Sequence, residues 1–191
     1  MHIARLLLTP SATGRMKYMK KHNLFGMLGK NVHIQGRILP LYSNLIYIHD
    51  NVMIASDVTF VTHDIVHKML NNKYKTDRYS ERVGCIEIMD NVFIGAGTKI
   101  LYNTRIGSNV IVGAGSIVTR DIPDNSVYAG IPARYICSFD EYVEKAQKYS
   151  EDSASAFGNK RIREMDDGLA QKIYAGFVAQ RDEEQSRENN D

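Results

Sequence analysis

The chain has 191 residues, with 24 Lys and Arg against 22 Asp and Glu, and so a formal net charge of +2 at pH 7. Because this charge is small and the basic residues are spread along the chain, a nucleic-acid-binding protein is not expected. The length fits one domain with an appendage. Two cysteines, Cys85 and Cys137, form no metal-type spacing and no disulfide framework, so each is expected to be a small buried or half-buried thiol.

Residues 1–30 are expected to form an N-terminal helical or irregular segment. The apolar stretch before Thr9 and Pro10 spans only a few residues, which is too short for a signal sequence or a membrane span. We therefore expect a cytoplasmic protein without a membrane span.

Residues 31–137 carry a repeat of six residues. The first position of each unit is Ile or Val, the second is often Gly, and the fifth is small or β-branched. Gly and Asn tolerate the positive φ of a turn, and β-branched residues favour a short extended run. Each unit is therefore expected to be one strand and one turn, and stacked units predict a parallel β-helix. The first positions are Ile88, Ile94, Ile100, Ile106, Val112 and Val118, and the same phase returns earlier at Ile48, Ile54 and Phe60.

The repeat fails between Phe60 and the next residue in phase, Ile86 or Ile88. The intervening segment is polar and aromatic, with no regular apolar spacing, so we expect a loop extruded from the coil at residues 64–85. Loops of this length in a compact domain are usually functional. His63 lies at the mouth of the loop, which makes it a candidate site residue.

Residues 138–191 are expected to form a C-terminal helical tail with a disordered end. The stretches 139–149 and 166–180 have the character of helices, and the second places Leu169, Ile173, Phe177 and Val178 on one face. Residues 150–160 have the composition of a linker, and residues 181–191 that of a disordered segment.

Three stretches are specific enough to compare with a known family: VTHD at 61–64, IGAGTKI at 94–100 and VGAGSIVTRDIPDNSVYAGIPAR at 112–134. Over roughly residues 30 to 137 the chain resembles the left-handed β-helix hexapeptide acyltransferases, in the branch of maltose, galactoside and capsular-polysaccharide O-acetyltransferases. The resemblance implies a mainly β fold, a left-handed parallel β-helix with an extruded loop and a C-terminal helical extension. The left-handed winding comes from the resemblance alone, because parallel crossovers are otherwise right-handed.

The same resemblance makes His63 the catalytic general base. The family's histidine follows a repeat that NVMIASDVTFVTHD at 51–64 matches with two residues fewer, and Thr62 stands where the galactoside enzyme has Gly. The base would take the proton of an attacking hydroxyl, a role suited to an imidazole, in a direct attack within a ternary complex. His67 is the alternative if the alignment shifts. Asn44 and Asp64 are the candidate acceptor-binding residues, and either could orient His63.

The resemblance also implies acetyl-CoA as cosubstrate, laid along the coil between two subunits, with no metal required. Ala96 would supply the backbone N–H for the oxyanion and would line the pantetheine track with Ala114. Thr119 and Arg120 would meet the phosphate and adenine end, and Arg134 would add charge. Cys137 stands where the galactoside enzyme has a further Arg. The structural alternative is that the small residues serve tight corners and the Arg residues a solvated face.

A single triangular coil is thin and leaves apolar faces with little core behind them. Closed cyclic symmetry would bury such faces, and the resemblance implies a homotrimer with inter-subunit active sites. The implied activity is transfer of acetyl from acetyl-CoA to a hydroxyl of a sugar or saccharide acceptor, in polysaccharide modification or saccharide detoxification.

Four other activities stay open. Within the same class, an amino sugar or a nucleotide-linked amino sugar would be N-acetylated, or the acceptor would be an antibiotic. From other classes come a γ-carbonic-anhydrase-like metalloenzyme and a non-catalytic solenoid scaffold. His49, His63 and His67 lie in the half of the chain that the anhydrase requires, but its downstream pair of ligands is not matched.

Overall fold

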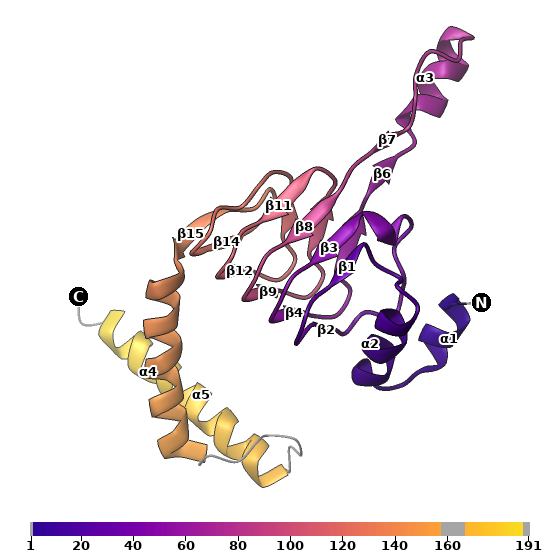
Figure 1. Ribbon diagram of the computed structural model, residues 1–191. Helices are drawn as coiled ribbons and strands as arrows, with labels where there is room; N and C mark the ends of the chain where they lie inside the picture. The colour runs from indigo at the N-terminus through magenta and orange to yellow at the C-terminus, as the bar shows by residue number, and fades with distance from the viewer. Residues whose placement is uncertain (1, 158–166, 189–191) are drawn as a thin grey trace. The chain divides into compact units, whose positions relative to one another are not determined.

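The computed structural model describes residues 2–157 and 167–188 (Figure 1). The chain divides into two compact units, Met1–Val143 and Glu144–Asp191. We call them the coil unit and the tail unit. The coil unit contains the whole six-residue repeat, and the candidate site residues all lie within it.

Three sheets form the sides of the coil unit (Figure 1). Their strands are parallel, except that β15 runs antiparallel to β14 at one edge. The first sheet holds β1 (Met27–Leu28), β3 (Ile46–Ile48), β8 (Ile86–Ile88) and β11 (Thr104–Ile106). The second holds β2 (His33–Ile34), β4 (Val52–Ile54), β9 (Val92–Ile94), β12 (Val110–Val112), β14 (Ser126–Ala129) and β15 (Arg134–Ser138). The third holds β5 (Thr59–Val61), β10 (Lys99–Leu101) and β13 (Ile117–Val118).

The chain visits the three sheets in rotation, one short strand on each, from β8 through β13. Ile86 pairs with Thr104 and Lys99 with Ile117, in both cases eighteen positions later. One coil therefore consumes three units of six residues. The prediction of one strand and one turn per unit is confirmed by this pairing.

The first position of each unit forms the core, as predicted. Every one of these residues from Ile88 to Val118 is at most 1% exposed. The fifth position points inward as well, because the set Val92, Thr98, Thr104, Val110, Ser116 and Ile122 is also buried. Two side chains per unit therefore fill the narrow interior. Burying one Ile in this way contributes about 1.5–3 kcal/mol, as an upper estimate.

Asparagines form a ladder along the corner between the first and second sheets, which we call the asparagine corner. Each has a φ between 51° and 58°, a left-handed conformation that Asn tolerates better than most residues. The Nδ2 of each of the first four donates to the Oδ1 of the asparagine in the next coil, at 2.6 to 3.0 Å. The members are Asn31, Asn51, Asn91, Asn109 and Asn125.

Two helices, α1 (His2–Leu8) and α2 (Ala12–Lys21), cover the N-terminal end of the coil. They bury Leu6, Met16 and Met19 in the core. The coil itself begins at β1, which pairs with β3, so part of the expected irregular segment 1–30 already belongs to the first coil. Between β2 and the short helix η1 (Ser43–Leu45) this first coil has no strand in the third sheet.

The break in the repeat is a projecting arm, defined here as residues 63–83 (Figure 1). Thr59 pairs with Lys99, 40 positions later, so 22 positions exceed the eighteen of a regular coil. The arm consists of the antiparallel strands β6 (His63–Asp64) and β7 (Arg82–Val83) with helix α3 (Val66–Tyr74) between them. The segment expected at residues 64–85 does leave the coil, but it is not a loop throughout, because nine of its residues form α3.

Helix α4 (Phe139–Phe157) begins in the coil unit and continues into the tail unit, which also contains α5 (Asp167–Glu188). Ser138 and Glu141 cap α4 reciprocally: Ser138 N–H donates to Glu141 Oε2, and Glu141 N–H donates to Ser138 Oγ.

Residues 150–157, expected to belong to a linker, are helical, and so is most of the expected disordered end. The remaining residues of both predictions, 158–160 and 189–191, lie outside the described residues. No helix in the described ranges is long and apolar enough to cross a membrane.

Candidate functional site

The backbone around His63 is held on both sides. Thr62 is 1% exposed, and its Oγ1 donates to the carbonyl oxygen of Leu41 at 2.7 Å. On the returning side of the arm, Gly84 N–H donates to the carbonyl oxygen of Thr62 at 3.0 Å, and Val83 pairs with His63 across the two arm strands. The hydroxyl that distinguishes Thr62 from glycine thus ties the start of the arm to the preceding coil.

The His63 ring packs against Tyr42. The two ring centroids are 5.1 Å apart and the planes cross at 75°, an edge-on contact. Nδ1 of His63 is buried without a hydrogen-bond partner in the described part of the chain, whereas Nε2 is not buried. Tyr42 has φ 54° and ψ 39°, a left-handed conformation that costs a bulky residue about 1 kcal/mol or more. The site therefore presents one accessible ring nitrogen beside a strained aromatic residue.

Asp64 joins the arm to the neighbouring coil. Its Oδ1 accepts from Val66 N–H at 3.0 Å, at the start of α3, and its Oδ2 accepts from the hydroxyl of Tyr102 at 2.8 Å. The hydrogen bond from Tyr102, then the one from Val66, and more weakly the charge of Arg82, hold the pKa of Asp64 below its usual range. Neither carboxylate oxygen is hydrogen-bonded to His63, so Asp64 does not orient the ring in the way considered from the sequence.

The other two candidates from the sequence, Asn44 and His67, lie on either side of His63 along the chain. Asn44 is exposed, sits on η1 two positions after Tyr42, and makes no hydrogen bond to His63. His67, the alternative base, is half-buried on α3, and its Nδ1 is buried without a partner among the described residues.

Ala96 and Ala114 stack in successive coils at the corner between the second and third sheets, which we call the alanine corner. Both side chains are exposed, and Gly115 N–H donates to the carbonyl oxygen of Ala96 at 2.8 Å. A Cβ on Gly95 would lie 2.4 Å from the backbone nitrogen of Ala114, so no larger residue fits there. Arg134, exposed at the start of β15, pairs with Ala129 beside this corner.

The predicted site residues therefore divide between two corners. His63 and Asp64, with Thr119 and Arg120 two coils further on, lie at the corner between the third and first sheets, which we call the arm corner. A strand of the third sheet separates it from the alanine corner. With a rise of about 3.3 Å per residue, His63 and Ala96 of one chain are on the order of 15 Å apart. Within one chain the fold does not bring His63 and Ala96 together.

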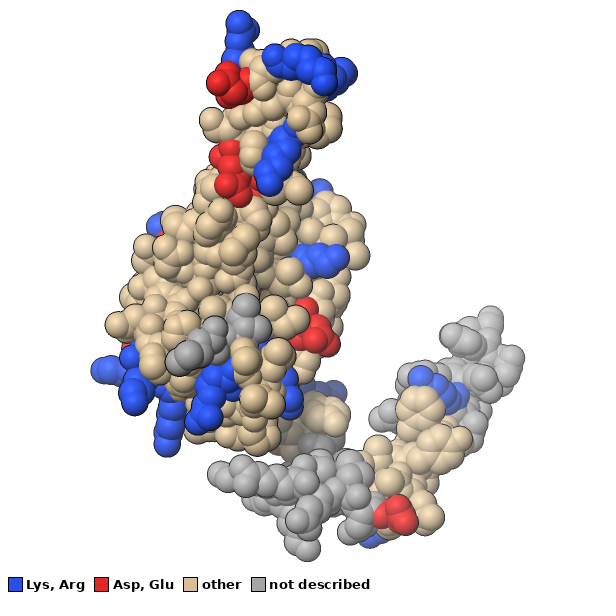
Figure 2. Space-filling view, turned by 90° about the vertical axis from the view of Figure 1, so that its right-hand side faces the viewer, with Lys and Arg blue, Asp and Glu red and all other residues tan. Residues whose placement is uncertain are grey.

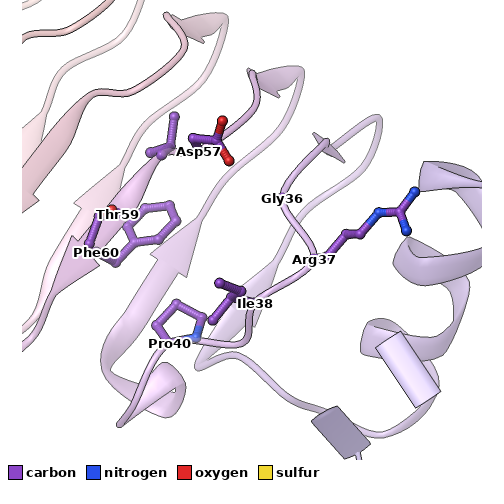
Figure 3. A pocket seen from close by; sticks show the side chains of 8 residues that line it. Gly36, Arg37, Ile38, Pro40, Asp57, Thr59 and Phe60 are labelled. Atoms are coloured by element: carbon purple, nitrogen blue, oxygen red, sulfur yellow. The ribbon is translucent and has the colours of Figure 1, made fainter. Parts of the chain in front are cut away.

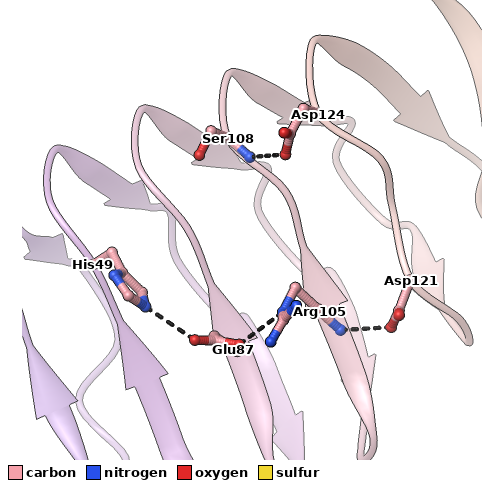
Figure 4. A network of polar contacts seen from close by, with 6 residues as sticks. All are labelled: His49, Glu87, Arg105, Ser108, Asp121 and Asp124. Atoms are coloured by element: carbon pink, nitrogen blue, oxygen red, sulfur yellow. Dashed lines mark hydrogen bonds and ion pairs between the residues drawn. The ribbon is translucent and has the colours of Figure 1, made fainter.

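His49 lies apart from the two histidines of the arm. Its Nε2 is 3.1 Å from Glu87 Oε1, and Arg105 Nε donates to Glu87 Oε2 at 2.7 Å (Figure 4). The hydrogen bond from His49, then the pairing with Arg105, lowers the pKa of Glu87. In the described residues no three His, Cys, Asp or Glu side chains converge as a metal site within one chain.

The two cysteines differ from each other. Cys137 is half-buried, as expected, but Cys85 is exposed, because it lies at the arm corner between β7 and β8 and outside the inward-facing positions.

A cleft of about 260 Å³ in the first coil was missed by sequence reasoning. It lies between residues 36–40 and residues 57–60 (Figure 3). The side chains of Ile38, Pro40 and Phe60 face one another, and that of Arg37 points away toward the N-terminal helices (Figure 3). The signal in the sequence is a missing repeat unit after β2. The first coil therefore has no strand that pairs with β5 in the third sheet, and the cleft lies there.

Comparisons with known proteins agree with the coil. Residues 86–120 match the model of the bacterial transferase hexapeptide family. Galactoside O-acetyltransferase of Escherichia coli (strain K12) is 40% identical over 116 residues, which are 56% of this chain and 54% of the relative. The chain thus spans about half the length of the curated relatives it matches.

Two solved structures show the same fold. A maltose O-acetyltransferase from Clostridium difficile 630 has a TM-score of 0.53 at 30% identity, with coverage of 71% of this chain and 82% of that one. A galactoside acetyltransferase in complex with coenzyme A has a TM-score of 0.57 at 28% identity, with coverage of 75% and 80%. Repeat, fold and sequence identity agree that this chain belongs to the bacterial transferase hexapeptide family.

Proposed function

We propose that the protein transfers an acetyl group from acetyl-CoA to a hydroxyl of a sugar or saccharide, with His63 as the general base. The names of the similar galactoside and maltose O-acetyltransferases, and the coenzyme A in one of those structures, support the reaction class. The observation that carries the assignment of the base is the position of His63 at the foot of the arm, with Nε2 accessible and the backbone fixed on both sides.

In this proposal the acceptor hydroxyl attacks the thioester carbonyl carbon while Nε2 of His63 takes its proton. The carbonyl oxygen becomes an oxyanion, which the backbone N–H of Ala96 stabilises. When the intermediate collapses, the carbon–sulfur bond breaks and His63 returns the proton to the leaving thiolate. No Ser or Cys nucleophile is needed, because both substrates are held together in one complex.

We further propose that the coil winds left-handed, as in the family, and that three chains assemble with closed symmetry. The division of the site supports this assembly, because the arm corner of one chain and the alanine corner of another would together supply base and oxyanion donor. The buried Nδ1 of His63, without a partner among the residues that the structure describes, fits a site that a second copy completes.

The base is tested by acetyl-CoA consumption against a panel of sugars, amino sugars and nucleotide sugars. His63→Ala is expected to lower turnover roughly 10²–10⁴-fold while acetyl-CoA binding persists. His67→Ala is the matched control, and it should retain most of the activity. Unchanged turnover of His63→Ala would reject the assignment. Treatment of the product with hydroxylamine separates an ester, which it cleaves, from the amide of an N-acetylated acceptor.

The shared site is tested by mixing two inactive variants. His63→Ala removes the base, and Ala96→Trp blocks the alanine corner. If each site takes its base from one chain and its donor track from another, randomly mixed trimers should regain about a quarter of the wild-type activity. If base and track belong to one chain, mixing restores nothing. A stable monomer in light scattering would also contradict the assembly.

A further inference from the structure

Acidic residues are distributed very unevenly along the chain. The first 49 residues contain seven Lys and Arg and no Asp or Glu, whereas the rest contains 17 Lys and Arg against 22 Asp and Glu. The formal charge is therefore +7 for the first part and −5 for the remainder. The basic residues are spread along the chain, so the asymmetry arises from the absence of Asp and Glu in the first 49 residues. An asymmetry of this size orients a protein toward a negatively charged partner.

The helices that cover the N-terminal end of the coil carry much of this positive charge. Helix α2 turns Met16 and Met19 into the core, and Lys17 and Lys21 are exposed. These two lysines are one helical turn apart and lie on the side opposite the methionines. Figure 2 shows Lys and Arg side chains gathered along the lower part of the face that it presents. The outward side of α2 is thus cationic.

Apolar side chains are exposed at the end of α1, on the same N-terminal cover of the coil. Leu6 of α1 is buried, but Leu7 is 48% and Leu8 80% exposed. Arg37 Nη1 lies 3.5 Å from the carbonyl oxygen of Leu7, which places a guanidinium group at the end of α1. The surface therefore combines large aliphatic side chains with neighbouring guanidinium and ammonium groups.

We propose that this N-terminal surface, formed by the outward sides of α1 and α2 with Arg37, docks the protein on a membrane that contains anionic lipids. Basic groups near such a membrane are attracted to its surface potential, and exposed aliphatic side chains enter the boundary between headgroups and acyl chains. A soluble polyanion would use the same charges but has no place for the exposed side chains of Leu7 and Leu8, so the apolar component favours the membrane. The proposal does not rest on the acetyl-transfer activity.

The test is sedimentation of the full chain with vesicles of phosphatidylcholine, with and without phosphatidylglycerol. The wild type is expected to bind the anionic vesicles and to be released as salt is raised. Lys17→Gln combined with Lys21→Gln should lower the partition coefficient roughly 10–30-fold. Leu8→Gln should lower it roughly 10-fold. The matched control, Lys145→Gln with Lys148→Gln on exposed positions of α4, should change it by less than about twofold.

Thermal unfolding of each variant establishes that the fold is retained, which is expected because the substituted side chains are exposed. Equal binding to both kinds of vesicle, or equal losses in the α4 control, would overturn the proposal. So would a wild type that binds dextran sulfate but neither kind of vesicle, since the surface would then serve a soluble polyanion. Loss of vesicle binding with intact acetyl transfer would support the docking surface and leave the proposed function standing.

Discussion

The asparagine ladder gives a stability prediction whose size follows from the structure. Asn109 has φ 55°, accepts from Asn91 Nδ2 at 3.0 Å and donates to Asn125 Oδ1 at 2.8 Å. Asn109→Ala removes both side-chain hydrogen bonds, each contributing about 0.5–1.5 kcal/mol. It also leaves an alanine in the left-handed conformation, which costs about 1–2 kcal/mol because alanine lacks the polar side chain by which Asn tolerates this conformation. We expect a loss of about 2–5 kcal/mol in the free energy of unfolding.

Asn109→Gly separates the two contributions. It removes the same hydrogen bonds, but glycine adopts a positive φ freely, so the expected loss is smaller than that of Asn109→Ala by about 1 kcal/mol. Urea unfolding at one fixed protein concentration measures both losses, because an oligomer unfolds in a concentration-dependent way. Ser108→Ala is the adjacent control and should change little, since Ser108 uses only its backbone: its N–H donates to Asp124 Oδ1 and its carbonyl oxygen accepts from Asn125 N–H. If Ala proves no worse than Gly at position 109, the backbone argument is wrong.

Three further predictions concern the core and the arm. Ile94→Ala should cost about 2–5 kcal/mol by the same urea assay, because it leaves a cavity at a fully buried position. Tyr102→Phe should raise the pKa of Asp64 toward its ordinary value, measured by NMR titration of the carboxyl carbon, and should speed proteolysis of the arm. Because the pKa of Asp64 is lower in the folded protein, its ionised form stabilises the fold above its ordinary pKa of about 3.9, and this contribution is lost as the pH falls through the depressed value. Wild type should therefore lose its stability advantage over Asp64→Asn at acid pH, as followed by hydrogen exchange in the arm.

The coil could be predicted because the period of the repeat reports directly which side chains point inward. Ile94 and Ile100 are fully buried for the reason that the spacing suggests. The fifth position carried a weaker signal, since Thr98 and Ser116 are polar and yet buried. Their hydroxyls donate to the carbonyl oxygen of Gly113, which makes a polar side chain acceptable in the interior.

The arm and the first coil were harder to predict, for different reasons. Helix α3 buries none of its residues, so it lacks the apolar stripe facing a core by which a helix is recognised. Strand β1 joins the first sheet with Met27 and Leu28, which are not β-branched, and it is recognisable only by its pairing with β3. The resemblance identified the candidate residues. To place them at two different corners, one must know that a coil takes eighteen residues and that the arm inserts further residues between two coils.

The position of the arm allows the two halves of the site to vary independently. Across the arm, Ile46 pairs with Ile86, Val52 with Val92 and Thr59 with Lys99, all 40 positions apart. Because the offset is the same in all three sheets, the inserted residues are confined to one corner and the core passes it without a change of register. The alanine corner, in contrast, lies within regular units where Gly95 leaves no room for a Cβ. Changes of length or composition in the arm should therefore alter the KM for the acceptor and leave the binding of acetyl-CoA unchanged, whereas substitutions at the alanine corner should do the reverse.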